Sequence, residues 1–320
     1  MPETALESEL CIILNPNAAK GKALSHRTEI EAFFLQAGIP ISMELTTRPF
    51  EAIDFAHKAV ASGYKTIIAA GGDGTMNEVV DGVIRATREM KLSHEEAPVV
   101  GLIPIGRGND FAFFAGIPNS VGAACQLIAD RIWSSIDYGE VFGGRFPEGR
   151  CFVNGVGIGF EPMVNFVASD FKRVSGMLSY LLGFLKVWVH YPSAIRLHFE
   201  SEQGSFYCDT QQVSLCNGRR MGSTFIMGPY AELDDGLLDI VYANKPIKWG
   251  EILRYAIKFF SGSQLKTDRF SMFRAQRITI TSDSNNLVCH TDGEEVSRGC
   301  NQIGVTLYPS GLKCIRKIQS

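Results

Sequence analysis

The chain has 320 residues, of which 45% are hydrophobic and 20% charged, and its formal net charge is -3. This length and composition allow a sizeable core and two domains, and they exclude global disorder. The slightly negative charge provides no overall attraction to nucleic acid, so we expect no nucleic-acid partner. Eight cysteines without a C-x-x-C pair favour free thiols in a reducing cytosol over a disulfide framework or a zinc site.

Two features argue against export and against a membrane-spanning segment. The most apolar stretch, Met177 to Val189, contains Lys186 and is shorter than the ~20 residues that cross a bilayer. The first ten residues contain three glutamates and no basic residue, so they lack the positively charged start of a secretory signal. We therefore expect a cytoplasmic protein that is soluble or attached peripherally to the inner face of the membrane.

Residues 1–136 alternate short apolar runs with amphipathic segments. The runs typical of buried strands are Leu10 to Leu14, Ile41 to Leu45, Thr66 to Ala70 and Val99 to Pro104. The segments with helical periodicity are Ala23 to Ala37, Phe50 to Ser62, Met76 to Met90 and Val121 to Arg131. This alternation predicts an α/β domain with a parallel sheet.

Residues 137–320 have a different texture, which predicts a mainly β sandwich domain whose extreme C-terminus packs back on the first domain. The expected strands are Phe152 to Val156, Ala194 to Glu200, Gln211 to Cys216, Leu237 to Tyr242, Arg277 to Ser282 and Gln302 to Tyr308. Two helices are expected among them. One has an apolar stripe from Val174 to Val189, and the other has Trp249, Ile252, Leu253, Ala256 and Phe260 on one face.

A glycine-rich turn follows the third predicted strand and precedes a helix. It reads Gly71-Gly72-Asp73-Gly74-Thr75-Met76-Asn77-Glu78. Glycines let backbone N–H groups approach a phosphate, and a helix N-terminus adds unpaired donors and a favourable dipole. The sequence is neither a Walker A motif nor G-x-G-x-x-G. The turn is therefore either a phosphate cradle or a plain βα turn in which Asp73 or Thr75 caps the helix.

Two further polar loops follow strands of the same predicted sheet. Asn15 to Lys22 follows the first strand, and Ile103 to Phe111 leaves the end of the fourth. Each loop taken alone has the composition of an ordinary turn. In open α/β sheets, however, ligands bind at the carboxyl ends of the strands, so three such loops together predict a ligand site.

These segments carry a family resemblance. In order, NPNAAKGKA, GGDGTMNEV and IPIGRGNDFA resemble the diacylglycerol kinase catalytic domain of soluble bacterial lipid kinases, a group that includes sphingosine and ceramide kinases. The resemblance continues through VNGVGIGF, AELDDGLLDI and TDGEEV. It implies an NAD-kinase-like α/β nucleotide domain, a β-sandwich domain, an ATP site in the cleft between them, and phosphorylation of a lipid hydroxyl.

The resemblance also assigns residues to the nucleotide. Those expected at its phosphates are Asn15, Pro16, Asn17, Ala18, Ala19, Thr47, Gly71, Gly72, Asp73, Gly74, Thr75, Met76 and Asn77. Asp73 would organise the catalytic Mg²⁺, since a carboxylate holds a hard cation against phosphate oxygens. Where the family usually has threonine this chain has Arg107, whose guanidinium could bind phosphate in place of the lost hydroxyl.

Two acidic loops in the second domain have assigned roles. Leu233 to Leu237 has the composition of a plain turn, but the resemblance implies a structural Mg²⁺ held by the carbonyls of Glu232 and Leu237 and the carboxylate of Asp235. In Asp292-Gly293-Glu294, the resemblance makes Glu294 the acceptor of the substrate's proton. Sequence alone cannot choose between Glu294 and Glu295, and without the resemblance this loop would be a solvated hairpin turn.

The segment from Asn244 to Arg277 contains eight basic and two acidic residues with aromatic residues among them. Lys248, Glu251, Arg254 and Lys258 would share one helical face, which suits an anionic bilayer. The same composition suits RNA, or a basic face that is only solvated.

Taken together, the sequence predicts an ATP- and Mg²⁺-dependent lipid kinase with diacylglycerol as the leading acceptor. The alternatives are a kinase of another lipid alcohol such as a sphingoid base, an NAD kinase, which shares GGDGT, and a non-catalytic protein that binds nucleotide or lipid. The oligomeric state is open, with a homodimer among the alternatives.

Overall fold

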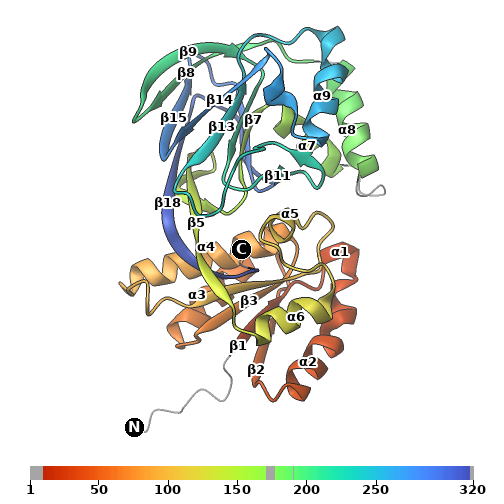
Figure 1. Cartoon of the computed structure of the whole chain (residues 1–320), viewed down its shortest axis with the longest axis vertical. Helices are drawn as coiled ribbons and strands as arrows, with labels where there is room; N and C mark the ends of the chain where they lie inside the picture. The colour runs from red at the N-terminus through yellow and green to blue at the C-terminus, as the bar shows by residue number, and fades with distance from the viewer. Residues whose placement is uncertain (1–9, 171–176, 190, 318–320) are drawn as a thin grey trace. The chain divides into compact units, whose positions relative to one another are not determined.

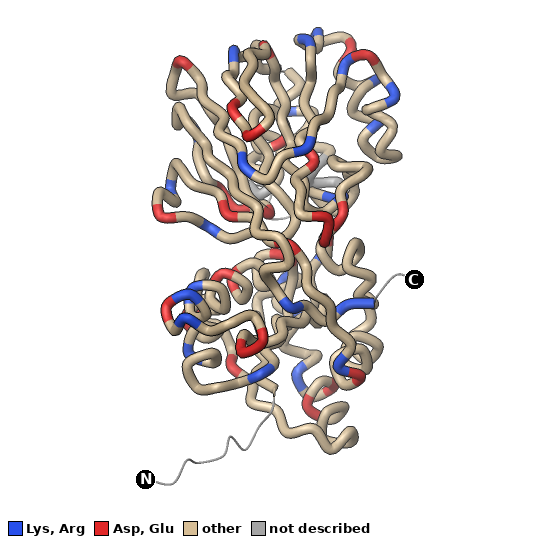
Figure 2. The backbone as a smooth tube through the Cα atoms, turned by 60° about the vertical axis from the view of Figure 1, so that its left-hand side comes forward, with Lys and Arg blue, Asp and Glu red and all other residues tan. Residues whose placement is uncertain are grey.

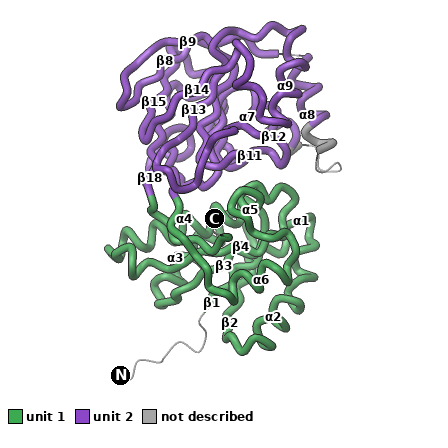
Figure 3. Tube along the Cα trace, viewed as in Figure 1, with its two compact units in different colours: residues 1–136, 310–320 green, residues 137–309 purple. Residues whose placement is uncertain are grey.

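The computed structural model describes residues 10–170, 177–189 and 191–317. The chain forms two compact units, which are residues 1–136 with 310–320, and residues 137–309 (Figure 3). Strands β5 (Trp133–Gly143) and β18 (Gln302–Ile315) each begin in one unit and end in the other. Basic and acidic residues are interspersed along both units (Figure 2).

Unit 1 contains a parallel sheet in the order β2-β1-β3-β4, and the end of β18 pairs with β4 in parallel through Lys313 and Cys314. These strands are β1 (Leu10–Leu14), β2 (Ile41–Leu45), β3 (Thr66–Gly71) and β4 (Val99–Pro104). β1 and most of β3 and β4 are buried, as expected for strands covered on both faces. The register aligns Leu14 with Ala70 and Ala70 with Ile103, so β1, β3 and β4 end level with one another.

The helices of unit 1 connect these strands. They are α1 (Ala18–Gly21), α2 (Arg27–Gln36), α3 (Glu51–Ala61), α4 (Asp73–Glu89), α5 (Asp110–Phe114) and α6 (Val121–Ala129), with a 3₁₀ turn at Ala23–His26. α3 buries a stripe of small residues that includes Ala52 and Ala56. A Cβ on Gly82 of α4 would lie 2.4 Å from the carbonyl oxygen of Ile53, so α3 and α4 pack backbone against backbone.

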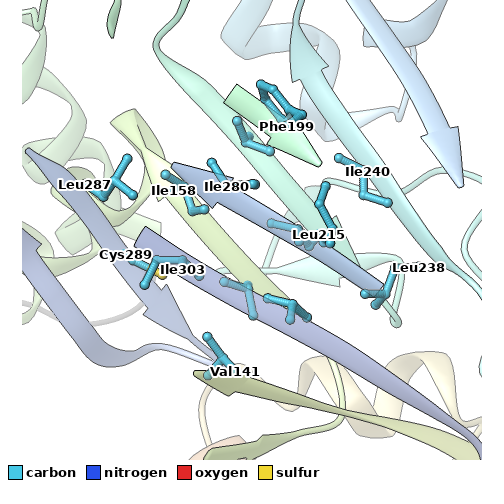
Figure 4. Close-up of a cluster of buried hydrophobic side chains, with 14 of the residues drawn as sticks. Val141, Ile158, Phe199, Leu215, Leu238, Ile240, Ile280, Leu287, Cys289 and Ile303 are labelled. Carbon is cyan, nitrogen blue, oxygen red and sulfur yellow. The ribbon is translucent and has the colours of Figure 1, made fainter. Parts of the chain in front are cut away.

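Unit 2 is a β-sandwich. One sheet contains β18-β15-β8-β9 with β5 and β6, and the other has the order β14-β13-β10-β7-β16-β17. In Figure 4, Ile158, Leu215 and Ile240 of the second sheet face Phe199 and Ile280 of the first across a dry core. The strands of unit 2 not yet bounded are β6 (Phe146–Phe152), β7 (Gly155–Gly159), β8 (Ile195–Ser201), β9 (Gly204–Thr210), β10 (Gln212–Cys216), β11 (Arg220–Met221), β12 (Phe225–Ile226), β13 (Leu238–Ala243), β14 (Phe270–Ala275), β15 (Arg277–Ser282), β16 (Leu287–Thr291) and β17 (Glu294–Cys300).

Three helices gather on one side of the sandwich (Figure 1). They are α7 (Phe160–Asp170), α8 (Met177–Val189) and α9 (Ile252–Phe260), and 3₁₀ turns lie at Trp249–Glu251 and Gln264–Lys266. Ile252, Tyr255 and Phe259 point from α9 into a second apolar cluster. Within the described residues, no helix is both long and apolar enough to cross a membrane.

The predicted fold class is confirmed, since an α/β unit with a parallel sheet is joined to a β-sandwich. Some elements were predicted wrongly. The strand expected over 152–156 is interrupted at Val153 and Asn154, because β6 ends and β7 begins there. The sequence interpretation omitted α7 and strands β5, β9, β14, β16 and β17. Residues 1–9 and Val174, which entered that interpretation, lie outside the described residues.

The apolar stripe expected on α9 was also partly wrong. The helix buries Ile252, Tyr255 and Phe259, whereas Leu253 and Phe260 are exposed. All eight cysteines are free thiols, and most are buried. Burial raises the pKa of Cys11 to about 12, which fits a small apolar core residue.

Candidate active site

The three polar loops of unit 1 begin side by side at the carboxyl edge of its sheet. The N–H of Asn15, just after β1, donates to the carbonyl of Ala70 in β3 at 3.0 Å. The N–H of Ile105, just after β4, donates to the carbonyl of Gly71 at 2.7 Å. The sheet therefore brings the segments after β1, β3 and β4 to one place.

Two of these loops touch through glycines. A Cβ on Gly106 would lie 2.4 Å from the Cα of Gly72, and a Cβ on Gly72 would lie 3.1 Å from the Cα of Gly106. A Cβ on Gly71 would lie 2.4 Å from Oγ1 of Thr75. By contrast, a Cβ built on Gly74 would meet no neighbouring segment within 4 Å, so this side of the first turn of α4 faces open space. The N–H groups at the N-terminus of this 17-residue helix suit a phosphate.

Asp73 is the first residue of α4, and its carboxylate is held in place. Its Oδ1 accepts the N–H of Phe111, in α5, at 3.0 Å. Among the described residues, none donates a hydrogen bond to its other oxygen. A carboxylate fixed beside a phosphate-binding helix end is a ligand that Mg²⁺ prefers, so the residues present fit the ion that the family implies.

The loop after β1 is tied to the same helix. Nδ2 of Asn15 donates to Oγ1 of Thr75 at 3.2 Å, and Oδ1 of Asn15 accepts the N–H of Asn17 at 3.0 Å. Ala19 and Lys20 have left-handed φ angles of 51° and 63°. This conformation costs roughly 1–2 kcal/mol per non-glycine residue, and such strain is concentrated at functional sites.

Other residues assigned to the nucleotide have local roles. Met76 and Asn77 are buried in α4, and the N–H of Met76 donates to Gly72, so their side chains belong to the core. The N–H and hydroxyl of Thr47 both donate to the carboxylate of Glu51, the first residue of α3, and these two bonds lower the pKa of Glu51. Arg107 is exposed, and within the described part of the chain it forms no ion pair. Direct contact of these four residues with nucleotide stays a prediction.

In unit 2, the predicted acidic loop is the tight turn between β16 and β17. Asp292 and Gly293 have left-handed φ angles of 45° and 84°. The Asp292 carboxylate accepts the N–H groups of Val153, Asn154 and Gly155 at 2.9, 3.1 and 2.8 Å. Asp292 therefore anchors the turn to the connection between β6 and β7 and is not available as a proton acceptor.

The two glutamates that follow, Glu294 and Glu295, have different arginine partners. Nε and Nη2 of Arg150 donate to Oε2 of Glu294 at 2.9 and 2.8 Å, and the Arg150 side chain is only 2% exposed. Glu295 instead pairs with the exposed Arg298 at 2.7 Å and lies 3.6 Å from Arg145. A buried guanidinium stabilises a carboxylate in its charged form and fixes its direction. Glu294 therefore has the surroundings of a positioned base, and Glu295 those of a surface residue.

The predicted structural metal loop is pinned at both ends. Oδ1 of Asp235 accepts the N–H of Leu237 at 3.0 Å, and Oδ2 of Asp137 accepts the N–H of Gly236 at 2.7 Å. Nη1 of Arg274 lies 3.6 Å from Asp235, and its Nε donates to Asp239 at 2.8 Å.

The carboxylates at this loop carry more negative charge than the single positive charge of Arg274 offsets. Burial raises the pKa of Asp239, Arg274 opposes that rise, and Asp235 and Glu232 add to it. Oδ2 of Asp239 is buried and accepts no hydrogen bond from any described residue. The described residues form no cluster of three acidic, histidine or cysteine ligands, so a cation here would need the carbonyls of Glu232 and Leu237. With those carbonyls, the loop fits the Mg²⁺ that the family implies.

Unit 2 also contains an apolar pocket. Aliphatic and aromatic side chains make up most of its wall, with Glu161 and Gln212 as its carboxylate and amide. Its walls come from α7, α8, α9 and neighbouring strands, and the lining residues are Phe160, Glu161, Val164, Phe184, Tyr191, Gln212, Phe225, Met227, Ile247, Ile252, Tyr255, Ala256, Phe259 and Phe270.

Two known family models match the chain. A model described as "Diacylglycerol kinase catalytic domain" matches residues 9–141, and one described as "YegS C-terminal NAD kinase beta sandwich-like domain" matches residues 154–316. The chain belongs to the diacylglycerol kinase catalytic-domain family. The crystal structure of an NAD kinase from Archaeoglobus fulgidus in complex with ATP has a similar fold, with a TM-score of 0.50 and 11% identity over 96% of this chain and 93% of that one, which confirms the NAD-kinase-like fold predicted for the first domain.

Individual members of this family align with most of the chain. "Probable lipid kinase YegS-like" of Xanthomonas oryzae pv. oryzae (strain MAFF 311018) is 31% identical over 265 residues, which are 82% of each protein. "Diacylglycerol kinase" of Bacillus subtilis (strain 168) is 28% identical over 286 residues, or 88% of each. The crystal structure of a diacylglycerol kinase from Bacillus anthracis str. Sterne has the same fold, with a TM-score of 0.70, 20% identity and 98% coverage of both chains.

The candidate site of this diacylglycerol kinase family member contains residues that were not identified from the sequence. Arg150 lies 144 residues from Glu294 along the chain, and nothing in its local sequence marks it. Glu161 follows a glycine-rich strand, and the sequence interpretation did not single it out. A signal was available there, because Pro162 follows it, and proline is typical of the first turn of a helix.

Proposed function

We propose that this lipid kinase transfers the γ-phosphoryl group of ATP to the free hydroxyl of diacylglycerol, giving phosphatidic acid. The observation that carries the choice of a lipid acceptor is the apolar pocket of unit 2, whose wall is mainly aromatic and aliphatic. Such a lining suits acyl chains and not NAD, which is polar and carries a charged diphosphate. The 28% identical relative named "Diacylglycerol kinase" supports diacylglycerol among lipid alcohols.

The nucleotide belongs to unit 1 in this proposal. The N–H groups in the first turn of α4 and the loop after β1 bind its phosphates, and Asp73 holds Mg²⁺ beside them. When bound, Mg²⁺ supplies positive charge that offsets the charge developing on the phosphate oxygens. Arg107 is exposed on the loop after β4 and would supply a guanidinium to the same anionic group.

Proton removal from the acceptor belongs to Glu294. In phosphoryl transfer the chain positions the hydroxyl and takes its proton, and a carboxylate within hydrogen-bond reach suffices for that. Arg150 donates to Oε2 of Glu294, and the carboxylate of Asp292 anchors the turn to residues 153–155. The base is therefore preorganised before the acceptor arrives.

The acceptor resides in a bilayer, so the proposal includes a surface that binds membranes. Leu181, Leu185 and Val189 of α8 and Leu253, Ile257 and Phe260 of α9 are 42–70% exposed, and we call them the docking face. The Trp188 and Trp249 rings stack 5.2 Å apart, and each indole N–H donates to the other's carbonyl, which ties α8 to the start of α9. Lys248 and Arg254 are exposed beside them and would attract anionic lipids.

A product assay tests the proposal. The protein is incubated with γ-labelled ATP and Mg²⁺, together with diacylglycerol, monoacylglycerol, sphingosine or ceramide in mixed micelles, or with NAD. Labelled phosphatidic acid as the main product supports the proposal. Preferential labelling of another lipid alcohol would change the acceptor, labelled NADP would make the chain an NAD kinase, and binding of ATP without any labelled product would indicate a non-catalytic protein.

A further inference from the structure

His290 lies at the end of β16, two residues before the turn that carries Asp292 and Gly293, and it is 1% exposed. Both of its ring nitrogens have partners. Nδ1 lies 3.2 Å from the N–H of Gly293, and Nε2 lies 2.5 Å from Oε2 of Glu161. The ring therefore connects the turn before Glu294 to helix α7 on the wall of the apolar pocket.

The partners fix the proton on the ring. A backbone N–H can only donate, so Nδ1 of His290 is the acceptor, and the ring proton sits on Nε2 and is donated to Glu161. Glu161 is itself placed by its backbone N–H, which donates to Oε1 of Gln212 at 2.9 Å. Burial alone would lower the pKa of His290, but Glu161 and then Asp292 outweigh burial and raise it.

The neighbouring strand leaves room for this pair. Gly157 of β7 is the register partner of His290. A Cβ on Gly157 would lie 2.3 Å from Oε2 of Glu161 and 2.8 Å from Nε2 of His290. The φ angle of Gly157 is not left-handed, so glycine is required there for space alone. Strand β7, strand β16 and helix α7 thus meet at the imidazole of His290.

We infer that His290 is a positioning residue for Glu294, and this inference rests on the proposed role of Glu294 as the base. The N–H that His290 accepts belongs to Gly293, the residue directly before Glu294. Asp292 holds the other side of the turn and Arg150 holds the far end of the Glu294 carboxylate. Without the His290 contact, the N–H of Gly293 loses its acceptor, and the backbone that leads into Glu294 is held less firmly.

Two isosteric substitutions separate the contacts of the ring. In His290→Asn, the amide oxygen takes the place of Nδ1 and can accept the Gly293 N–H, but the side chain is too short for Glu161. In His290→Gln, the amide nitrogen takes the place of Nε2 and can donate to Glu161, but no acceptor faces Gly293. We expect His290→Gln to lower kcat for lipid phosphorylation roughly 10- to 100-fold with KM for ATP unchanged, and His290→Asn to retain most of the wild-type kcat.

Hydrogen exchange provides a readout that does not depend on catalysis. Protection of the Gly293 amide should be lost in His290→Gln and kept in His290→Asn, and melting temperatures identify any loss of folding. If kcat falls equally in both variants, or falls only in His290→Asn, the contact with Gly293 is not what matters and the inference is overturned. An inactive wild type overturns the proposed function, whereas an active wild type with an unimpaired His290→Gln variant overturns the positioning role alone.

Discussion

Arg150 donates through both Nε and Nη2 to the same oxygen, Oε2, of Glu294. The guanidinium is buried on strand β6, whereas the Glu294 side chain on β17 is 21% exposed, so a buried charge holds a carboxylate that lies nearer the surface. This arrangement leads to the first prediction. Glu294→Gln should reduce phosphoryl transfer by ~10²- to 10⁴-fold, because the amide cannot take the proton of the acceptor.

The affinity for ATP should remain near the wild-type value in this variant, since Glu294 lies in unit 2 and the predicted nucleotide loops lie in unit 1. Steady-state rates and ATP titration measure the two effects separately. Glu295→Gln is the matched control and should retain activity, because Glu295 pairs with exposed arginines. If Glu295 proves essential and Glu294 dispensable, the base is Glu295 and this prediction is wrong.

The second prediction concerns Asp73. Asp73→Asn keeps an oxygen that can accept the Phe111 N–H, so the fold should survive. The substitution removes the negative charge that would hold Mg²⁺ among the phosphates, and charged groups of this kind contribute ~10²-fold or more to turnover. We expect kcat to fall by about that factor while the melting temperature changes little. Near-normal turnover of the folded variant would remove Asp73 from the catalytic machinery.

The third prediction compares a glycine of the nucleotide loops with one outside them. Gly106→Ala would place a Cβ 2.4 Å from the Cα of Gly72, so the loops after β3 and β4 must separate. Gly122→Ala, in α6 of the same unit, meets no neighbouring atom within 4 Å and is the control. ATP titration should show at least roughly tenfold weaker binding for Gly106→Ala, since misplaced donors lose a charged ligand's hydrogen bonds. Equal affinity in both variants would place the nucleotide elsewhere.

The parts of this structure that the sequence predicts are those formed by residues close together in the chain. The strands of unit 1 are continuous apolar runs such as Leu10–Leu14, and burial on both faces gives them a local signature. The glycine loops are equally local. In unit 2, by contrast, β17 mixes buried and exposed residues without a clean alternation, so composition does not distinguish it from a loop.

The side-chain pairs of the site are long-range and leave no local signal. Glu161 and His290 are 129 residues apart, and Arg150 and Glu294 are 144 apart. Only the register of β7 with β16, which brings Gly157 opposite His290, creates the first pair. The family resemblance identifies Glu294, but what orients Glu294 comes from strand pairing that no single segment encodes.

The fourth prediction tests the loop from Glu232 to Leu237. If Asp235 and the two carbonyls bind Mg²⁺ only in the folded state, Mg²⁺ should raise the melting temperature of the wild type in the absence of nucleotide. Asp235→Ala should abolish that rise, and the exposed neighbour Asp234→Ala should keep it. Thermal melts with Mg²⁺ and with a chelator make the comparison. A wild-type melting curve indifferent to both would eliminate a structural metal at this loop.

The last prediction concerns the docking face on α8 and α9. Each basic residue near an anionic bilayer contributes about 1 kcal/mol, and the attraction fades beyond a Debye length of about 8 Å at physiological salt. Reversing Lys248, Arg254 and Lys258 to glutamate should therefore weaken binding to phosphatidylserine-containing vesicles by roughly tenfold or more. Lys58, Lys65 and Lys91 are exposed on unit 1, and reversing them changes the net charge equally without touching the docking face.

The apolar part of the docking face requires a separate variant. Ile257 is 58% exposed on α9, so Ile257→Glu should leave the fold intact but oppose insertion among acyl chains. Vesicle sedimentation and activity on vesicle-borne diacylglycerol should fall in both docking-face variants, while activity on a short-chain, water-soluble diacylglycerol changes little. If the Lys58, Lys65 and Lys91 reversals impair vesicle binding as strongly, net charge alone governs the attraction. If neither docking-face variant impairs it, the kinase reaches its lipid through another surface.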